Sequence, residues 1–142
     1  VESKDSQEST DPCGESYKGA SAFSEKETQA LRDFIDAKQK DLRFVINLHS
    51  NGNSYIYPYN GRVENDIVTR NPGKLEIFQE IAQEAKFPEN NVHNGNSKQI
   101  IGDQIGGDMD DWILATFNIP AVTGEIGNEN DFVDEWTVKS PQ

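Results

Sequence analysis

The stretch Phe44-Val45-Ile46-Asn47-Leu48-His49-Ser50-Asn51-Gly52-Asn53 decides the fold class of this chain. Its first part is short, apolar and partly β-branched, which predicts a buried strand, and the Asn-Gly residues after it predict a loop. The pattern places His49 at the carboxyl end of a central strand, where open α/β sheets hold their ligands. Imidazole is the commonest metal ligand, but a lone histidine at a strand end is more often a hydrogen-bonded structural residue. The rest of the chain has to decide between these two interpretations.

Composition restricts both the number of domains and the kinds of partner. A length of 142 residues suffices for one domain with a real core. A formal net charge of −12 disfavours nucleic acid and anionic membrane surfaces as partners. No apolar run approaches the roughly 18 residues that a membrane span requires, and the polar start at Val1 shows no signal peptide. The single cysteine, Cys13, excludes an intrachain disulfide, and we expect it to be a small buried residue.

Three helices are predicted. The first begins at Ser24, whose hydroxyl forms a capping box with Glu27, and runs to about Ala37. It is expected to bury one apolar face, made of Ala30, Leu31, Phe34 and Ile35. The second covers about residues 73–86, and the third about residues 108–117, with Asp108, Asp110 and Asp111 in its first turn. Acidic residues stabilise the positive N-terminal end of a helix, which is a sufficient structural explanation for these three.

Strands and loops complete the pattern. Residues 55–59 predict a second strand, and residues 121–126 a last strand that carries Glu125 near its end. Residues 60–72 and 88–98 are rich in loop-forming residues, and residues 1–11 are polar enough to predict a mobile leader. The alternation predicts an α/β fold, part of a mixed and mostly parallel sheet covered by helices. These strands are few for a doubly wound sheet, so we expect the chain to be part of a larger domain.

Five motifs, in the same order, resemble the zinc carboxypeptidases of the carboxypeptidase A type. They are the loop Asp11-Pro12-Cys13-Gly14-Glu15-Ser16-Tyr17-Lys18-Gly19, the helix start Ser24-Glu25-Lys26-Glu27-Thr28, the strand Ile46-Asn47-Leu48-His49-Ser50 with Tyr57-Pro58-Tyr59, Gly106-Gly107 with Asp111-Trp112, and Gly124-Glu125. The resemblance covers nearly the whole chain. It implies a zinc-peptidase-like α/β/α fold, with residues 12–142 as the C-terminal portion of the catalytic domain. It also implies a hydrolase that removes C-terminal residues of peptides with metal-activated water.

The resemblance implies a role for each matched residue. His49 matches the histidine that completes the zinc site, and Glu125 matches the general base on the zinc-bound water, which later returns the proton to the leaving amine. Ser50 matches a residue whose backbone lines the substrate cleft. Asp110 falls at the base of the specificity pocket, where an acid favours a C-terminal Lys or Arg. Helix stabilisation remains an equally good explanation for Asp110.

Several features depart from the family pattern. The His-x-x-Glu motif that supplies the other two zinc ligands occurs nowhere in the chain, and the upstream arginines and asparagine that hold the substrate are absent as well. Asp103 stands where the family has a mobile tyrosine, and Asn51 stands where a tyrosine usually follows His-Ser. A second acid in the cleft would repel a substrate carboxylate. His93, the other histidine, lies in a polar segment and is not expected to bind metal.

Three interpretations of the function therefore remain open. The first is a zinc metallocarboxypeptidase of which this chain is a fragment, inactive by itself because two zinc ligands are expected upstream. The second is a degenerate, non-catalytic peptide-binding module on the same scaffold, and a generic acidic α/β binding domain is a third interpretation. The family implies peptide or protein C-termini as partners, neither nucleic acid nor membrane, and a monomer. By analogy alone it implies an extracellular or digestive-vacuole (lysosomal) location.

Overall fold

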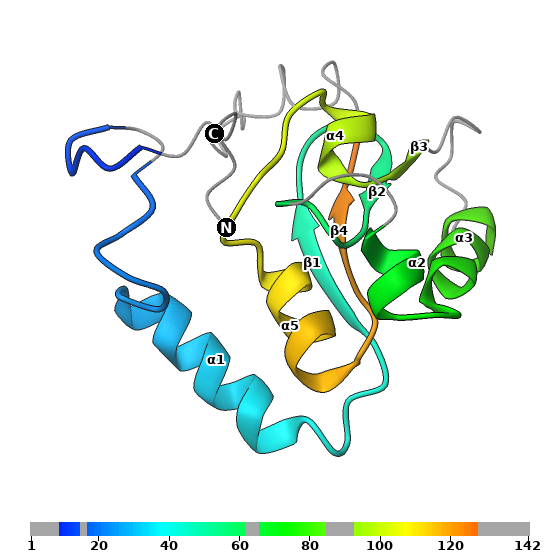
Figure 1. Cartoon of the computed structure of the whole chain (residues 1–142), viewed down its shortest axis with the longest axis horizontal. Helices are drawn as coiled ribbons and strands as arrows, with labels where there is room; N and C mark the ends of the chain where they lie inside the picture. The colour runs from blue at the N-terminus through cyan, green and yellow to red at the C-terminus, as the bar shows by residue number, and fades with distance from the viewer. Residues whose placement is uncertain (1–8, 15–16, 62–65, 85–92, 128–142) are drawn as a thin grey trace, which may run out of the picture.

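A computed structural model of the chain describes residues 9–14, 17–61, 66–84 and 93–127 (Figure 1). Within these residues it contains a four-stranded sheet with helices beside it. The elements are, in chain order, α1 (Lys26–Lys38), β1 (Val45–His49), β2 (Ser54–Ile56), α2 (Asp66–Arg70), α3 (Lys74–Glu84), β3 (His93–Gly95), α4 (Ser97–Ile100), α5 (Met109–Phe117) and β4 (Ala121–Glu125). No described helix is both long and apolar enough to cross a membrane.

The sheet is mixed and mostly parallel, as expected. Its strand order is β1-β4-β2-β3, in which β1 runs parallel to β4 and β2 runs parallel to β3, while β2 and β4 are antiparallel. Within the described residues the order places β1 at an edge of the sheet, whereas a central strand was expected. Ile46 and Leu48 are accordingly exposed rather than buried. An apolar sequence predicts that a strand is buried, but it cannot show which neighbouring chain buries it.

Each face of the sheet carries its own apolar cluster. Successive residues of a strand point to opposite faces, and the neighbours Ala121 and Val122 of β4 belong to different clusters. Ala121 packs with Ile35 of α1 and Ile113 of α5. Val122 packs on the other side with residues from α2, α3 and the segment after β2, including Ile67, Phe78 and Tyr57. The helices therefore lie on the two sides of the sheet that Figure 1 shows.

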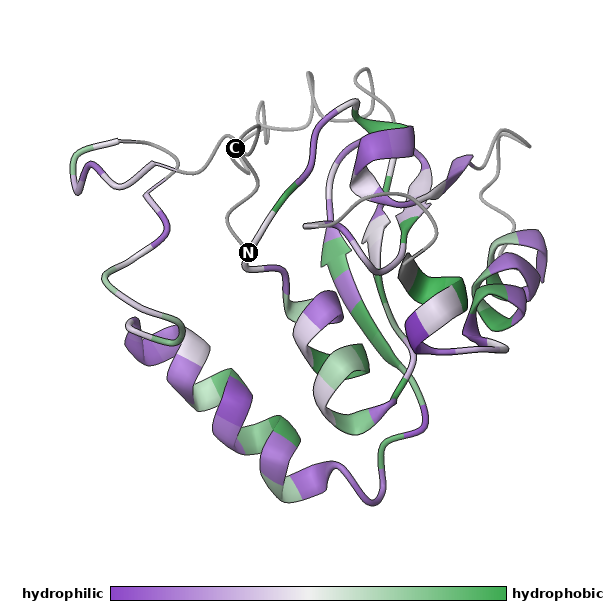
Figure 2. Cartoon of the chain, viewed as in Figure 1, coloured by the Kyte–Doolittle hydropathy of each residue, from purple (hydrophilic) through white to green (hydrophobic). Residues whose placement is uncertain are grey.

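Helix α1 differs from the prediction in its start and in its burial. The N-cap residue is Glu25, without a side-chain cap, and the Ser24 hydroxyl donates to Glu25 Oε1 at 2.9 Å. The predicted capping box is therefore wrong, because the helix begins one residue later. Only Ile35 of the predicted apolar face is buried, whereas Ala30, Leu31 and Phe34 are exposed. Figure 2 shows apolar and polar turns alternating along this helix.

Two predicted loops contain regular structure. Helix α2 lies within residues 60–72. Strand β3 and the first two residues of α4 lie within residues 88–98, of which 88–92 fall outside the described residues. The polar segment at β3 forms a strand because it pairs with β2, and Asn96 then caps α4 through a capping box with Gln99. Cys13 is exposed, contrary to expectation. Ser9 forms a bridge with Tyr17, and residues 1–8 of the predicted leader lie outside the described part.

Candidate active site

His49 and Glu125 lie side by side at the carboxyl ends of two parallel strands. They are register partners between β1 and β4, so their side chains project from the same face of the sheet. His49 Nδ1 lies 3.9 Å from Glu125 Oε1. The strand ends are held together beyond this pair, because the Ile126 amide donates to the His49 carbonyl at 2.9 Å. The sheet register thus brings together the two residues that the family resemblance had singled out.

A cavity of about 300 Å³ adjoins this pair. Asn47 and Thr123 line it from the strands, each two residues before His49 or Glu125 and therefore on the same face. Asp108 lines it from the start of α5. Asn47 and Thr123 were not singled out from the sequence, although the two-residue period of a strand could have identified them. The cavity thus lies between the carboxyl end of the sheet and the start of a helix.

The start of α5 is fixed by a buried hydrogen-bond network around Asn60. The Asn60 amide donates to Asp111 Oδ1 at 2.8 Å, and its side-chain Nδ2 donates to Asp108 Oδ2. Asn60 Oδ1 accepts from the Ser97 amide at 2.8 Å, and Asp108 Oδ1 accepts from the Asp110 amide at 3.0 Å. Asp108 is therefore the N-cap of α5, as the helix-stabilising explanation requires. Asn60 was missed from the sequence because its partners lie 37 to 51 residues away.

Asp110 is fully buried next to the cavity. Its Oδ2 accepts from Thr123 Oγ1 at 2.7 Å, whereas Oδ1 has no hydrogen-bond partner among the described residues. Burial, together with the nearby negative charges of Asp108 and Asp111, raises the pKa of Asp110 to about 8, against the opposing effect of the Thr123 hydrogen bond. Asp110 is connected to the cavity through Thr123, since Asp110 itself is not part of the cavity lining.

The other predicted site residues are distributed around this centre. Ser50 is exposed directly after β1, and Asn51 lines a second cavity of about 300 Å³, together with Glu125 and His93. His93 is brought there by register, because Ser54 of β2 pairs with both His93 and Glu125. Asp103 lies in the turn after α4 and lines neither cavity. Of the predicted site residues, Glu125 alone lines both cavities.

A catalytic zinc requires three protein ligands and an open position for water. No group of three His, Cys, Asp or Glu side chains that could hold a metal occurs among the described residues. The pair at the strand ends fits one imidazole ligand and one neighbouring carboxylate, since Nδ1 of His49 faces Glu125. The donor set is consistent with a part of a zinc site and not with a whole one.

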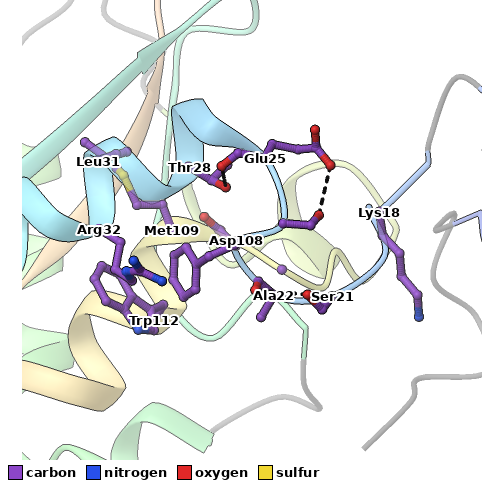
Figure 3. A pocket seen from close by; sticks show the side chains of 13 residues that line it. Lys18, Ser21, Ala22, Glu25, Thr28, Leu31, Arg32, Asp108, Met109 and Trp112 are labelled. Atoms are coloured by element: carbon purple, nitrogen blue, oxygen red, sulfur yellow. Dashed lines mark hydrogen bonds between the residues drawn. The ribbon is translucent and has the colours of Figure 1, made fainter.

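A third cavity, of about 280 Å³, lies between the loop before α1, α1 itself and the start of α5 (Figure 3). Phe23 packs edge-on against Trp112 with ring centroids 5.0 Å apart, and the Arg32 guanidinium lies 5.4 Å from the Phe23 centroid. At its rim the Ser24 hydroxyl donates to Glu25 Oε1, and the Thr28 hydroxyl donates to the Glu25 carbonyl. The aromatic contact at this cavity therefore joins the loop before α1 to α5.

The pair of His49 and Glu125 lies at the carboxyl ends of two parallel strands, where open α/β sheets hold their ligands. Residues 2–136 match the family model described as zinc carboxypeptidase, so the chain belongs to the zinc carboxypeptidase family. This family consists of zinc-dependent metallopeptidases, as the sequence motifs had implied.

Relatives and solved structures agree with the family. The chain is 31% identical over 108 residues to carboxypeptidase B of Helicoverpa zea, which is 73% of this chain and 25% of the relative. It is 30% identical over 114 residues to the zinc carboxypeptidase of Simulium vittatum, covering 79% of this chain and 36% of the relative. The crystal structure of thrombin activatable fibrinolysis inhibitor superposes with a TM-score of 0.68 at 26% identity, covering 86% of this chain and 31% of that one. The chain thus spans about a third or less of these proteins.

Proposed function

We propose that this chain is part of the catalytic domain of a zinc metallocarboxypeptidase, which hydrolyses C-terminal residues from peptides. The observation that carries the proposal is the in-register pair of His49 and Glu125, 3.9 Å apart at the carboxyl ends of β1 and β4. Membership of the zinc carboxypeptidase family supplies the class of reaction. Peptide or protein C-termini would be its partners, and we further propose a monomer with an extracellular or digestive-vacuole location.

In this proposal His49 is a single zinc ligand and Glu125 is the general base. Zinc bound beside His49 would act as a Lewis acid and lower the pKa of bound water. Glu125 stands on the rim of the adjoining cavity, where its carboxylate can accept a proton from the attacking water and return it to the leaving amine. The strand register holds Glu125 at a fixed distance from His49, which is what proton transfer at a defined atom requires.

The side-chain preference follows from the cavity beside Glu125. We propose that Asp110 selects C-terminal Lys or Arg, since it lies behind Thr123 in the cavity wall and has one carboxyl oxygen without a partner. A cationic side chain in the cavity would favour the ionised form of Asp110 and lower its pKa again. Ser50, Asn51 and Asp103 would contribute to substrate binding from the segments around the site.

The alternative is a non-catalytic peptide-binding module on the same scaffold. It is favoured by Asp103 and Asn51, which replace two tyrosines of the family pattern. The sequence of the full gene separates the two, because the enzyme needs a His-x-x-Glu motif upstream and the binding module does not.

The proposed chemistry is tested on the full-length protein with Glu125→Gln. Loss of a general base is expected to lower kcat by roughly 10²- to 10⁴-fold, while the zinc content stays at the wild-type level because Glu125 is not a ligand. The matched control, His49→Ala, should lower the zinc content as well as the rate. Retention of wild-type kcat by Glu125→Gln would refute its role as base.

A further inference from the structure

The cavity between the loop before α1, α1 itself and the start of α5, here called the α1–α5 cavity, has none of the proposed active-site residues in its lining. The apolar part of its lining is formed by Phe23, Leu31, Met109 and Trp112. Its volume of about 280 Å³ lies at the lower end of the range found for ligand pockets. The size therefore fits a small molecule rather than a stretch of peptide.

The loop before α1 holds an aromatic ring against this cavity. Phe23 has a φ of +56°, in the left-handed region that bulky side chains rarely adopt. Its carbonyl accepts from Gln29 Nε2 at 3.0 Å, and its ring packs on Trp112, which packs on Phe117 with centroids 5.3 Å apart. Backbone strain that the surrounding structure holds in place is a sign of a functional constraint, and here the constraint positions the Phe23 ring.

The polar rim of the α1–α5 cavity is rich in hydrogen-bond acceptors. The Ser24 hydroxyl donates to Glu25 Oε1 and the Thr28 hydroxyl donates to the Glu25 carbonyl, each at 2.9 Å. Because a hydroxyl has a single hydrogen, these two oxygens have only lone pairs left for a ligand. Glu25 and, from the start of α5, Asp108 add carboxylate groups to the lining. A ligand at this rim therefore has to supply the hydrogen-bond donors.

The two cationic residues of the lining do not reverse this preference. Arg32 Nη2 lies 2.7 Å from Asp33 Oδ1, and the guanidinium lies 5.4 Å from the Phe23 centroid, so its charge is already partly compensated. Lys18 extends away from the other labelled side chains in Figure 3. The net charge of −12 on the chain also attracts cations. The charges therefore favour a cationic ligand over an anionic one.

We propose that the α1–α5 cavity binds a small aromatic amine, in which a short alkyl chain joins an aryl ring to a primary ammonium group. The ring would lie on Trp112 and Phe23 in the offset or edge-on arrangement that aromatic pairs prefer. The ammonium group would bring three donors and a positive charge to the rim at Glu25 and Thr28. An inorganic cation lacks the ring and a hydrocarbon lacks the donors, so neither matches both parts of the lining. The proposed carboxypeptidase activity is not required for this binding.

Methyl NMR of the 142-residue chain, titrated with 2-phenylethylamine at pH 7, tests the proposal with two matched reporters. Thr28 belongs to the lining of the α1–α5 cavity and Thr123 to that of the cavity beside Glu125. We expect the Thr28 methyl signal to shift saturably below about 10 mM amine, while the Thr123 signal stays in place. Two further probes are 3-phenylpropionate, which carries a carboxylate in place of the ammonium, and ethylamine, which lacks the ring. Each should bind at least about tenfold more weakly than 2-phenylethylamine.

A pair of variants locates the ammonium group. Glu25→Gln keeps an acceptor for Ser24 and removes the charge, so it should weaken binding of 2-phenylethylamine at least about threefold. Glu27→Gln, at an exposed residue in the first turn of α1, is the matched control and should leave the affinity unchanged.

Four results would overturn the proposal. They are the absence of a saturable Thr28 shift, equal affinity for 2-phenylethylamine and 3-phenylpropionate, and unchanged affinity in Glu25→Gln. The fourth is a Thr123 shift that precedes the Thr28 shift, because the amine would then occupy the cavity beside Glu125.

Discussion

Glu125 and Asp110 are carboxylates near the same cavity, and their surroundings give them different roles. Glu125 lines the cavity and faces His49, and we propose that it exchanges protons with water there. Asp110 is fully buried, and burial raises its pKa to about 8, so it is largely protonated at neutral pH. Pairs of titratable groups whose environments differ in this way are typical of functional sites. The difference in burial between the two carboxyl groups is set by the fold, and the sequence alone does not show it.

The raised pKa of Asp110 makes stability depend on pH. The unfolded-state pKa of 3.8 lies below the folded-state value of about 8, so the folded chain holds a proton that the unfolded chain releases between these values. The stabilisation is fully present below pH 3.8 and is lost as pH rises toward 8. Asp110→Asn cannot ionise, and we expect it to exceed the wild type in unfolding free energy at pH 8 by about 1–3 kcal/mol, with little difference at pH 4.

Urea unfolding of the 142-residue chain at several pH values measures this difference. Exposed Asp41 offers the matched control, because Asp41→Asn removes a charge without removing a buried carboxyl. If the gap between Asp110→Asn and the wild type does not widen between pH 4 and 8, the proposed protonation of Asp110 is wrong.

Asp110 also carries the prediction on substrate preference. In the full-length enzyme we expect faster hydrolysis of C-terminal Lys or Arg than of Phe, since a charge-assisted contact favours the cation. Asp110→Ile removes the carboxyl and should reverse that order. The ratio of kcat/KM for peptides that differ only in the last residue measures the preference, and an unchanged ratio in Asp110→Ile contradicts the assignment.

At the level of elements, residues distant in the sequence position the site. Asn60, after β2, connects the start of α4 through Ser97 with the start of α5 through Asp108 and Asp111. These bonds hold the α5 end of the cavity against the sheet. We expect Asn60→Ala to lower the unfolding free energy by about 1–3 kcal/mol, because buried partners lose their hydrogen bonds.

Thermal or urea unfolding checks this prediction against Asn94→Ala, a change at an exposed asparagine of β3. The two variants delete the same side-chain atoms from different environments. Equal stability of the two would show that the Asn60 network is not a determinant of the fold.

The elements also show what sequence patterns can predict. Local sequence patterns predicted α3, α5 and β4 correctly in type and place. Polar β3 was missed because its strand conformation depends on pairing with β2, a contact that no local pattern contains. His49 and Glu125 were identified through the family motifs, but their adjacency follows from the β1–β4 register. Asn60 and the protonation of Asp110 depend on long-range packing and could not be predicted.

At the level of the whole molecule, zinc binding by the chain is limited because His49 has no further ligands beside it among the described residues. His49 and Glu125 are in place, yet no described group of three potential ligands could hold a metal. A catalytic zinc site takes three protein ligands and a water molecule. The affinity for zinc should therefore rise sharply only when the two other protein ligands are present.

We expect the 142-residue chain to bind zinc weakly and to cleave no peptide, whereas the full-length protein should bind one zinc tightly. Isothermal titration calorimetry with zinc, followed by hydrolysis assays on peptides ending in Lys, Arg or Phe, measures both properties. His49→Ala should remove most of the weak binding if His49 is the ligand that the chain contributes, and His93→Ala is the matched control at the other histidine. Tight, stoichiometric zinc binding by the 142-residue chain would contradict this expectation, because the ligands would then have to come from the chain itself.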